Sequence, residues 1–376
     1  MLPVAVLSMW FLSLLSLAVL GGGGYLLYAW YENLIIGAWP LVVGGLLLAL
    51  SLLGRPLALA VLGRAPRQGE REPVIERGGQ VHRLPRPDGT VLHIEQYGSG
   101  EGGTLVFTHG WGLNAAAWFY AKQLLAPRFR LILWDLPGLG ESRAPDNRNY
   151  ELPKLAADLA AVVEFAGGPV VLVGHSIGGM IMLTFAREFP ELMRRQVRGL
   201  VLTHTTPENP VRTAWLGSFW RAVQEPLIKP MCFLTILLSP VMRLLSWLGY
   251  FNGLLHTQIH FGQYGGQETR GQLEFAARFT PLASPAVSAR GMLAMTRYNA
   301  EDVLPRVNVP ALVIAADHDK ATLPAASLQL VRAIPGARIV TLSPAGHMGL
   351  FEQHTVWAEA VADFTVACFH DQPGLS

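Results

Sequence analysis

The segment Gly174-His-Ser-Ile-Gly178 places a serine between two glycines, directly after the apolar run 170–174. This run is typical of a buried strand, and the apolar pattern at 177–189 is typical of a helix. A sharp strand-to-helix turn strains the backbone of its central residue, and the flanking glycines leave room where strand and helix approach each other. The hydroxyl of Ser176 is therefore expected at a sheet edge, beside a helix N-terminus that favours developing negative charge. A serine nucleophile is presented in this way.

Alternating strand and helix patterns from residue 73 onward would position this serine. Strands are expected at 81–84, 91–97, 104–109, 130–135, 170–174, 197–204, 311–317 and 337–343, and helices at 115–126, 152–166, 177–189, 325–333 and 353–369. Continuous β-branched runs between amphipathic helices indicate an α/β fold with a mostly parallel, doubly wound sheet of about eight strands. The first two strands are expected to form an antiparallel hairpin at the sheet edge.

Ordered motifs make residues 73–376 resemble the α/β-hydrolase fold superfamily, in particular its capped ester-hydrolase and perhydrolase-like branches. His-Gly-Trp-Gly at 109–112 follows a strand as the oxyanion motif of that family does, and Asp-Leu-Pro-Gly-Leu-Gly-Glu-Ser at 135–142 is similar to the loop after the next strand. The segment 174–179 matches the nucleophile elbow. Ala-Asp-His-Asp at 316–319 stands where the family has Gly-x-x-Asp, and a Gly-His pair follows the last strand. The order Ser, Asp, His is that of the superfamily.

The resemblance implies a catalytic triad and an oxyanion hole. Ser176 would attack an acyl carbon, and His347 would take its proton and later deliver it to the leaving group. Asp319 would orient the imidazole and stabilise its cation. The backbone N–H groups of Trp111 and Ile177 would form the oxyanion hole. No metal or organic cofactor is implied.

Several of these residues have structural alternatives. Ser176 could be a helix N-cap, His347 a histidine of a surface loop, and Trp111 a core aromatic. Asp317 could compete with Asp319 as the acid, since alternation along a strand would place both on the same side. The motif position favours Asp319. Further polar residues are interpreted as structural rather than catalytic or metal-binding: Asp135, Ser142, His204, His256, His260 and His318.

The composition of the 376-residue chain bounds these hypotheses. Hydrophobic residues make up 51% and charged residues only 15%, whereas globular chains carry about 25% charged residues. Part of the chain is therefore expected outside water. A net charge of +2 without a dense basic run excludes electrostatic nucleic-acid binding. Cys232 and Cys368 are too few for a disulfide framework and are compatible with a reducing compartment.

The apolar excess lies mainly in residues 1–66, which are predicted to be a membrane anchor. No charged side chain occurs before Glu32, and a second apolar run covers 34–54. Each run can supply a span of about 20 residues, so two transmembrane helices are expected. The alternatives are a cleaved signal peptide with one retained helix, and a buried soluble hairpin. Four arginines follow the second run, which places the rest of the chain on the cytoplasmic side of a multi-pass protein. They are Arg55, Arg64, Arg67 and Arg71. Deletion of 1–66 is expected to leave a folded, active enzyme.

The alternation of strands and helices breaks at 207–300, which is predicted to be a helical cap inserted into a core of 73–206 and 301–376. Caps in the resembled family build the acyl or alcohol pocket. Six apolar cap residues are therefore candidates for substrate binding: Trp215, Phe219, Trp220, Phe233, Leu237 and Trp247. The alternative is that they only join the cap to the core.

The resulting hypothesis is a membrane-anchored serine hydrolase that cleaves a carboxylic ester through an acyl-enzyme. An apolar cap beside an anchor favours a small lipophilic ester, such as a fatty-acyl ester delivered from the bilayer, with the lipid bilayer as the other partner. A cofactor-free perhydrolase, C–C hydrolase or acyltransferase could use the same triad. A non-catalytic membrane binding or scaffold protein is the alternative from another class. The sequence does not indicate an oligomeric state.

Overall fold

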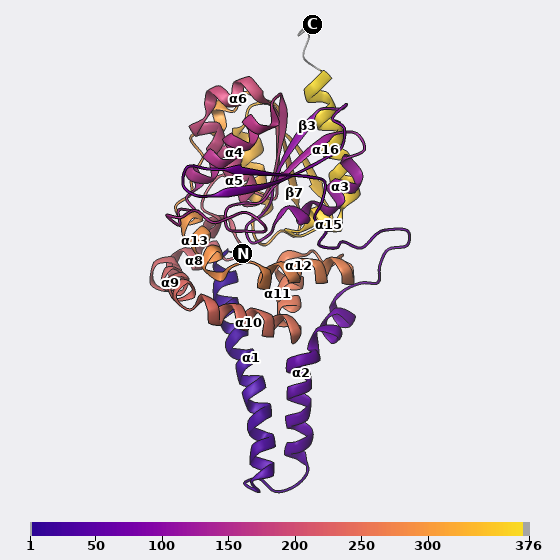
Figure 1. The fold of residues 1–376 in the computed structure, drawn as a ribbon, viewed down its shortest axis with the longest axis vertical. Coiled ribbons are helices and arrows are strands. Elements are labelled where there is room, and N and C mark those ends of the chain that lie inside the picture. The colour runs from indigo at the N-terminus through magenta and orange to yellow at the C-terminus, as the bar shows by residue number, and fades with distance from the viewer. Residues whose placement is uncertain (1, 371–376) are drawn as a thin grey trace.

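The computed structural model describes residues 2–370, arranged in three layers along one long axis (Figure 1). An α/β core lies at one end and a layer of helices lies in the middle. A hairpin of two long helices projects from the other end. The candidate nucleophile Ser176 lies in the core.

Eight strands form a single sheet in the order β1-β2-β4-β3-β5-β6-β7-β8. Their bounds are β1 (Gln80–Pro85), β2 (Val91–Tyr97), β3 (Thr104–Thr108), β4 (Arg130–Trp134), β5 (Val170–His175), β6 (Val197–Thr203), β7 (Ala311–Ala316) and β8 (Arg338–Leu342). The pairs β1–β2 and β2–β4 are antiparallel and all other pairs are parallel. The predicted mostly parallel sheet of eight strands is confirmed, with its antiparallel hairpin at the edge.

Helices cover both faces of the sheet, which explains the continuous apolar strand runs. Along β5, Val170 and Leu172 pack toward α4 (Leu152–Ala166) and α5 (Ile177–Glu188). The alternate residues Val171 and Val173 pack in the cluster on the opposite face. Strands buried on both faces need apolar residues at every position. Further elements are η1 (Ala115–Trp118), α3 (Phe119–Leu125), α6 (Pro190–Gln196), η3 (Leu304–Arg306), α14 (Pro324–Ala333), α15 (Gly349–Glu352) and α16 (His354–His370).

Between β6 and β7 the chain forms a layer of helices, here called the cap, which lies between the core and the hairpin (Figure 1). Its helices are α7 (Pro210–Thr213), α8 (Gly217–Val223), α9 (Lys229–Leu237), α10 (Ser239–Phe251), α11 (Leu254–Gln263), α12 (Arg270–Leu282) and α13 (Pro285–Met295), with a π-helical turn, η2 (Gln224–Ile228), before α9. This helical layer falls within the segment where the sequence pattern breaks.

The hairpin consists of α1 (Leu2–Tyr31) and α2 (Trp39–Leu62). Its segments Leu7–Tyr31 and Trp39–Leu62 are long and apolar enough to cross a membrane. The two helices approach closely at Gly23 and Gly44, since a Cβ on Gly44 would lie 2.9 Å from the carbonyl oxygen of Gly23. Small residues permit such close packing in membranes. Large apolar side chains such as Leu53, 69% exposed, disagree with a hairpin buried inside the domain.

The hairpin is joined to the cap by polar contacts rather than by a free linker. The indole Nε1 of Trp10 donates a hydrogen bond to Thr235 Oγ1 at 2.9 Å. Arg55 Nε lies 3.1 Å from a carboxylate oxygen of Glu274. The polar segment after α2 is also held, because the Arg67 guanidinium donates to the carbonyl of Glu352, at the end of α15, at 2.8 Å. The first 66 residues therefore share an interface with the cap, which the sequence patterns did not indicate.

Candidate active site

Ser176 lies at the turn between β5 and α5 and has the strained backbone that its sequence context predicts. Its φ is 55° and its ψ is −119°, a conformation that costs a non-glycine residue of order 1–3 kcal/mol. Two hydrogen bonds hold the turn: Ser176 N–H donates to the carbonyl of Thr203 at 3.0 Å, and Thr205 Oγ1 donates to the carbonyl of Ser176 at 2.7 Å. A Cβ on Gly178 would collide with the carbonyl oxygen of Thr108, so a glycine is required there.

The structure brings Ser176, His347 and Asp319 into one hydrogen-bonded chain. His347 Nε2 lies 3.1 Å from Ser176 Oγ, and His347 Nδ1 lies 2.9 Å from Asp319 Oδ2. Because a carboxylate only accepts, Nδ1 carries the proton and Nε2 is free to accept one from the serine hydroxyl. Ser176 occupies the N-cap position of α5, but its side chain makes no capping hydrogen bond and faces His347 instead.

Asp319 is held as an anion. Its Oδ1 accepts the backbone N–H groups of Ala321 at 2.7 Å and Thr322 at 2.9 Å, and its Oδ2 accepts the Thr322 hydroxyl at 2.8 Å. Burial alone would raise the pKa of this carboxyl group. The charge and hydrogen bond of His347 and the other donors outweigh burial, and the net pKa is lowered. The carboxylate can therefore stabilise a positive charge on the imidazole.

Asp317 does not share this position. Its carboxylate accepts the Ser343 hydroxyl at 2.6 Å and the Ala345 N–H at 2.9 Å, which ties down the loop after β8. The expectation that alternation places residues 317 and 319 on the same side is wrong, because β7 ends at Ala316 and both residues lie in the following turn.

Two buried histidines hold the backbone of His347. His175 Nε2 lies 3.1 Å and His204 Nδ1 lies 3.0 Å from the carbonyl oxygen of His347. Burial lowers the pKa of both side chains, that of His204 to about 4, so both are neutral and donate an N–H to this carbonyl. The sequence indicates a structural role for His204, and its local pattern assigns no role to His175. Their position at the ends of β5 and β6, the sheet edge that carries Ser176, was the available signal.

The two residues predicted to form the oxyanion hole are Trp111 and Ile177, the residue that follows Ser176 in the chain. Trp111 lines the same cavity as Ser176. Its indole donates to the carbonyl of Ser288 in α13 at 3.0 Å, and its ring occupies the space that a side chain at Gly291 would take. Ile177 is the first residue of α5, and an N–H in the first turn of a helix has no acceptor within that helix. Ile177 can therefore offer a backbone donor, and the backbone donor of Trp111 stays a prediction.

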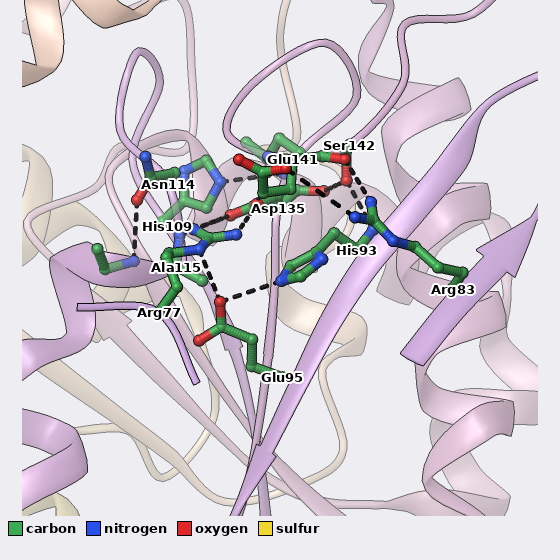
Figure 2. Close-up of polar contacts among 12 residues, drawn as sticks. Arg77, Arg83, His93, Glu95, His109, Asn114, Ala115, Asp135, Glu141 and Ser142 are labelled. Atoms are coloured by element: carbon green, nitrogen blue, oxygen red, sulfur yellow. Dashed lines mark hydrogen bonds and ion pairs between the residues drawn. The ribbon is translucent and has the colours of Figure 1, made fainter. Parts of the chain in front are cut away.

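A buried ionic network fixes the loop that carries Trp111 (Figure 2). Asp135 forms an ion pair with Arg77 and accepts the backbone N–H groups of Ala115 and Glu141, each at 2.7 Å. Burial would raise the pKa of Asp135, but the hydrogen bond and charge of Arg77 outweigh it and the net pKa is lowered. Asp135 is thus the anion that joins two loops.

His109 adds a second connection between the same loops. Its Nε2 accepts the N–H of Leu136 at 3.0 Å, so its Nδ1 carries the proton and donates to the carbonyl of Gly110 at 2.8 Å. Ser142 Oγ donates to the carbonyl of Asp135 at 2.7 Å and accepts the His93 N–H at 2.9 Å (Figure 2). The backbone around Trp111 is consequently preorganised.

A cavity of about 220 Å³ lies beside Ser176 and His347. Side chains from three cap helices contribute much of its apolar lining, including Leu255 and Ile259 of α11, Phe279 of α12 and Met292 of α13. Met9 of α1 contributes as well. The cavity can therefore take an apolar group next to the serine hydroxyl.

None of the six cap residues predicted to bind substrate lines this cavity: Trp215, Phe219, Trp220, Phe233, Leu237 and Trp247. Trp220 and Trp247 are half-buried and the other four are exposed. Trp215 precedes α8, and the other five side chains lie on faces of α8, α9 and α10 that do not line the cavity. Helical segments that are apolar on several faces do not reveal which face points inward.

The two histidines of α11 have acidic partners in α12 and in the segment just before it. His256 Nε2 lies 2.9 Å from Glu274, and His260 contacts Glu268. These carboxylates were not apparent from the local sequence around the histidines. Within residues 2–370, no group of three or more His, Cys, Asp or Glu side chains is arranged to hold a metal ion.

Known proteins resemble this chain in sequence and in fold. A model of the Alpha/beta hydrolase family matches residues 105–360. The pimeloyl-(acyl-carrier protein) methyl ester esterase of Xanthomonas oryzae pv. oryzae is 31% identical over 281 residues, which covers 73% of this chain and 99% of that protein. The protein of the same name from Stenotrophomonas maltophilia is 29% identical and covers 73% and 97%. A thermophilic esterase from Thermogutta terrifontis superposes with a TM-score of 0.61 at 22% identity, covering 77% of this chain and 99% of its own.

Proposed function

The chain belongs to the alpha/beta hydrolase family and is an ester hydrolase, and on this premise we propose that it is a membrane-anchored serine esterase with Ser176 as nucleophile. The observation that carries the proposal is the hydrogen-bonded chain from Ser176 through His347 to Asp319. The strained turn at the serine and the apolar cavity beside it support the same assignment.

The first half of the proposed reaction transfers the acyl group to the enzyme. Ser176 Oγ attacks the carbonyl carbon of the ester while His347 Nε2 takes the hydroxyl proton. The anionic Asp319 keeps the imidazole in its orientation and stabilises the imidazolium. When the ester C–O bond breaks, His347 delivers this proton to the departing alcohol. Water then attacks the acyl-serine by the same route, which releases the carboxylic acid and restores the serine hydroxyl.

The negative charge that develops on the carbonyl oxygen needs donors in place beforehand. The backbone N–H groups of Trp111 and Ile177 are proposed to provide them, each worth roughly 3 kcal/mol of transition-state stabilisation in enzymes of this kind. The network around Asp135 supports this assignment, because it keeps the loop of Trp111 from relaxing during the reaction.

The proposed domain organisation is a membrane anchor at 1–66, a catalytic core at 73–206 and 301–376, and a cap at 207–300. The anchor rests on α1 and α2, which are long and apolar enough to cross a bilayer. The core is assigned to the cytoplasmic side, because arginines cluster after α2 while the hairpin loop carries only Glu32.

The proposed substrate is a lipophilic carboxylic ester, in keeping with the apolar lining of the cavity. A second candidate is the reaction named for the relatives, hydrolysis of a methyl ester of a pimeloyl group on an acyl-carrier protein. The match over 99% of the Xanthomonas protein favours this candidate.

The two candidate substrates are separated by comparing hydrolysis of that carrier-bound methyl ester with hydrolysis of a long-chain ester presented in vesicles. Product analysis with peroxide or an acyl acceptor separates hydrolysis from perhydrolysis and transfer.

The nucleophile is tested by labelling the full-length protein in phospholipid vesicles with a fluorophosphonate probe. Labelling is expected at Ser176, identified by mass spectrometry of the adduct, and is expected to be lost in Ser176→Ala. Ser343→Ala is the matched control, because that exposed serine contacts Asp317 and not His347. A wild-type protein that takes up no probe and hydrolyses no ester would contradict the proposal and favour a non-catalytic binding protein.

A further inference from the structure

The cavity beside Ser176 extends as far as the first helix of the hairpin. Its lining includes Ser176 and His347 at the sheet edge and also Met9 of α1 and Thr235 of α9. In Figure 1, α1 begins near α8 and α13, where the cap meets the core. The hairpin is therefore part of the cavity wall as well as an attachment.

Hydrogen bonds hold this part of α1 in a defined register. Gln258 Nε2 donates to Ser8 Oγ at 2.6 Å, and Trp10 Nε1 donates to Thr235 Oγ1 at 2.9 Å. Both cap partners, Gln258 and Thr235, also line the cavity. Specific polar contacts on either side of Met9 fix its position in the wall, since polar groups join helices in apolar surroundings.

The part of the hairpin that is free of the cap is too short to span a bilayer. Asn252 donates to Ser16 of α1 at 2.7 Å, and its carbonyl fills the space beside Gly54 of α2. Beyond this level, residues 17–31 and 39–53 each extend about 22 Å at about 1.5 Å per residue. The hydrocarbon core of a bilayer is about 30 Å thick. A hairpin that crosses it therefore draws the adjoining part of the cap into the membrane.

The cap presents an apolar surface suited to that position. Phe233 and Leu237 of α9 and Val241 and Leu244 of α10 are between 50% and 75% exposed. Helix α10 packs beside α1 on the hairpin side of the cap (Figure 1). Clustered exposed apolar side chains mark a contact surface, and the depth of the hairpin identifies its occupant as the lipid leaflet.

We infer that the cap lies in the leaflet around α1, and that the apolar chain of the ester enters the cavity from this leaflet, past Met9. The inference rests on the proposed function and narrows its substrate to a membrane-dissolved ester with a long acyl or alkyl chain. The chain lies along the wall of α1 while the ester group reaches Ser176. The exposed side chains of α9 and α10 then contact lipid rather than substrate.

The wall is tested with the full-length protein in phosphatidylcholine vesicles, using p-nitrophenyl butyrate and p-nitrophenyl palmitate. Met9→Trp is expected to lower kcat/KM for palmitate about tenfold and to change that for butyrate less than about threefold, because one pocket contact discriminates by such factors. Met9→Ala is expected to shift the preferred chain length upward, the opposite direction. Leu14→Trp is the matched control, because Leu14 is 60% exposed on the same helix.

The possible outcomes separate this inference from the proposed function. An equal loss of kcat/KM for both esters in Met9→Trp, or the same chain-length effect in Leu14→Trp, would show that α1 does not contact the ester chain. The protein would still be a serine esterase. Absence of all ester hydrolysis and of probe labelling at Ser176 would overturn the proposed function itself. If Met9→Trp does not fold, the direction of the Met9→Ala shift decides the matter.

Immersion of the cap is measured separately by lipid quenching. Leu244→Cys, labelled with a bimane fluorophore in vesicles containing brominated lipids, is expected to lose most of its emission. Leu124→Cys on α3 of the core, also an exposed leucine, is expected to be unaffected. The native Cys232 and Cys368 are both buried, which limits background labelling. Absence of quenching at Leu244→Cys would place the cap outside the leaflet, and quenching there that is no stronger than at Leu124→Cys would overturn its selective immersion.

Discussion

The backbone and the side chain of His347 are held by groups of different charge. The anionic Asp319 contacts its Nδ1, whereas its carbonyl oxygen accepts two neutral imidazole N–H groups, from His175 and His204. Cationic donors at the carbonyl would oppose the imidazolium that the proposed mechanism forms on His347. Neutral histidines position the residue without this electrostatic cost.

Acid should weaken the fold through His204. Burial lowers the pKa of this side chain to about 4, below the value of about 6.5 expected in the unfolded chain. As the pH falls from 6.5 to 4, the unfolded chain binds a proton that the folded chain excludes. The free energy of unfolding is therefore highest above pH 6.5 and falls by up to about 3 kcal/mol toward pH 4 on account of this residue.

This pH dependence is measured by denaturant unfolding of the detergent-solubilised protein between pH 8 and pH 4. His204→Asn keeps a donor for the His347 carbonyl but does not titrate in this range, so its stability curve should be flatter than that of the wild type. Parallel curves for the two proteins would show that His204 is protonated in the folded state.

Among the elements, the loops around Asp135 depend on a buried ion pair. Arg77→Met leaves this carboxylate buried without its cation, which is expected to cost about 3–5 kcal/mol of stability. Arg83→Met is the control, because the Arg83 guanidinium lies 3.9 Å from the Glu141 carboxylate and donates to the Glu141 carbonyl in an exposed position, and exposed ion pairs contribute about 0–1 kcal/mol. Thermal unfolding of both variants tests the comparison. Similar melting temperatures would mean that Asp135 does not depend on Arg77.

The core elements could be predicted from the sequence because the inner strands β3 to β7 are buried on both faces and each carries one local apolar run. The turn at Ser176 was predictable for a similar reason, since Gly178 has no room for a side chain. The positions of Asp317 and Asp319 depend instead on where β7 ends, which no local pattern specifies. Which side chains of the cap line the cavity was harder still to predict, because α9 and α10 carry apolar residues on both buried and exposed faces.

At the scale of the whole molecule, the sequence predicts that the hairpin is a membrane anchor independent of the catalytic domain. In the structure, the hairpin packs against the cap. Hydropathy identifies residues that are expected to be shielded from water. It does not distinguish contact with lipid from contact with another helix. Trp10 illustrates the difference, because it packs against the cap cluster that contains Ile228 and Met292. The interface of the hairpin with the cap depends on pairs more than 200 positions apart, such as Trp10 with Thr235.

Removal of the hairpin is therefore expected to impair the enzyme, contrary to the expectation from the sequence. Deletion of residues 1–66 uncovers Ile228 and Met292 and removes the cavity wall at Met9, so the shortened protein should aggregate and lose hydrolysis of p-nitrophenyl palmitate.

The control keeps the hairpin but cuts the chain: a protease site introduced in the segment 65–73 is cleaved after folding in vesicles. The cleaved protein should remain assembled and active, because the contacts of α1 and α2 with the cap persist. Full activity of the deleted protein on palmitate would show that the hairpin serves only as an attachment to the membrane.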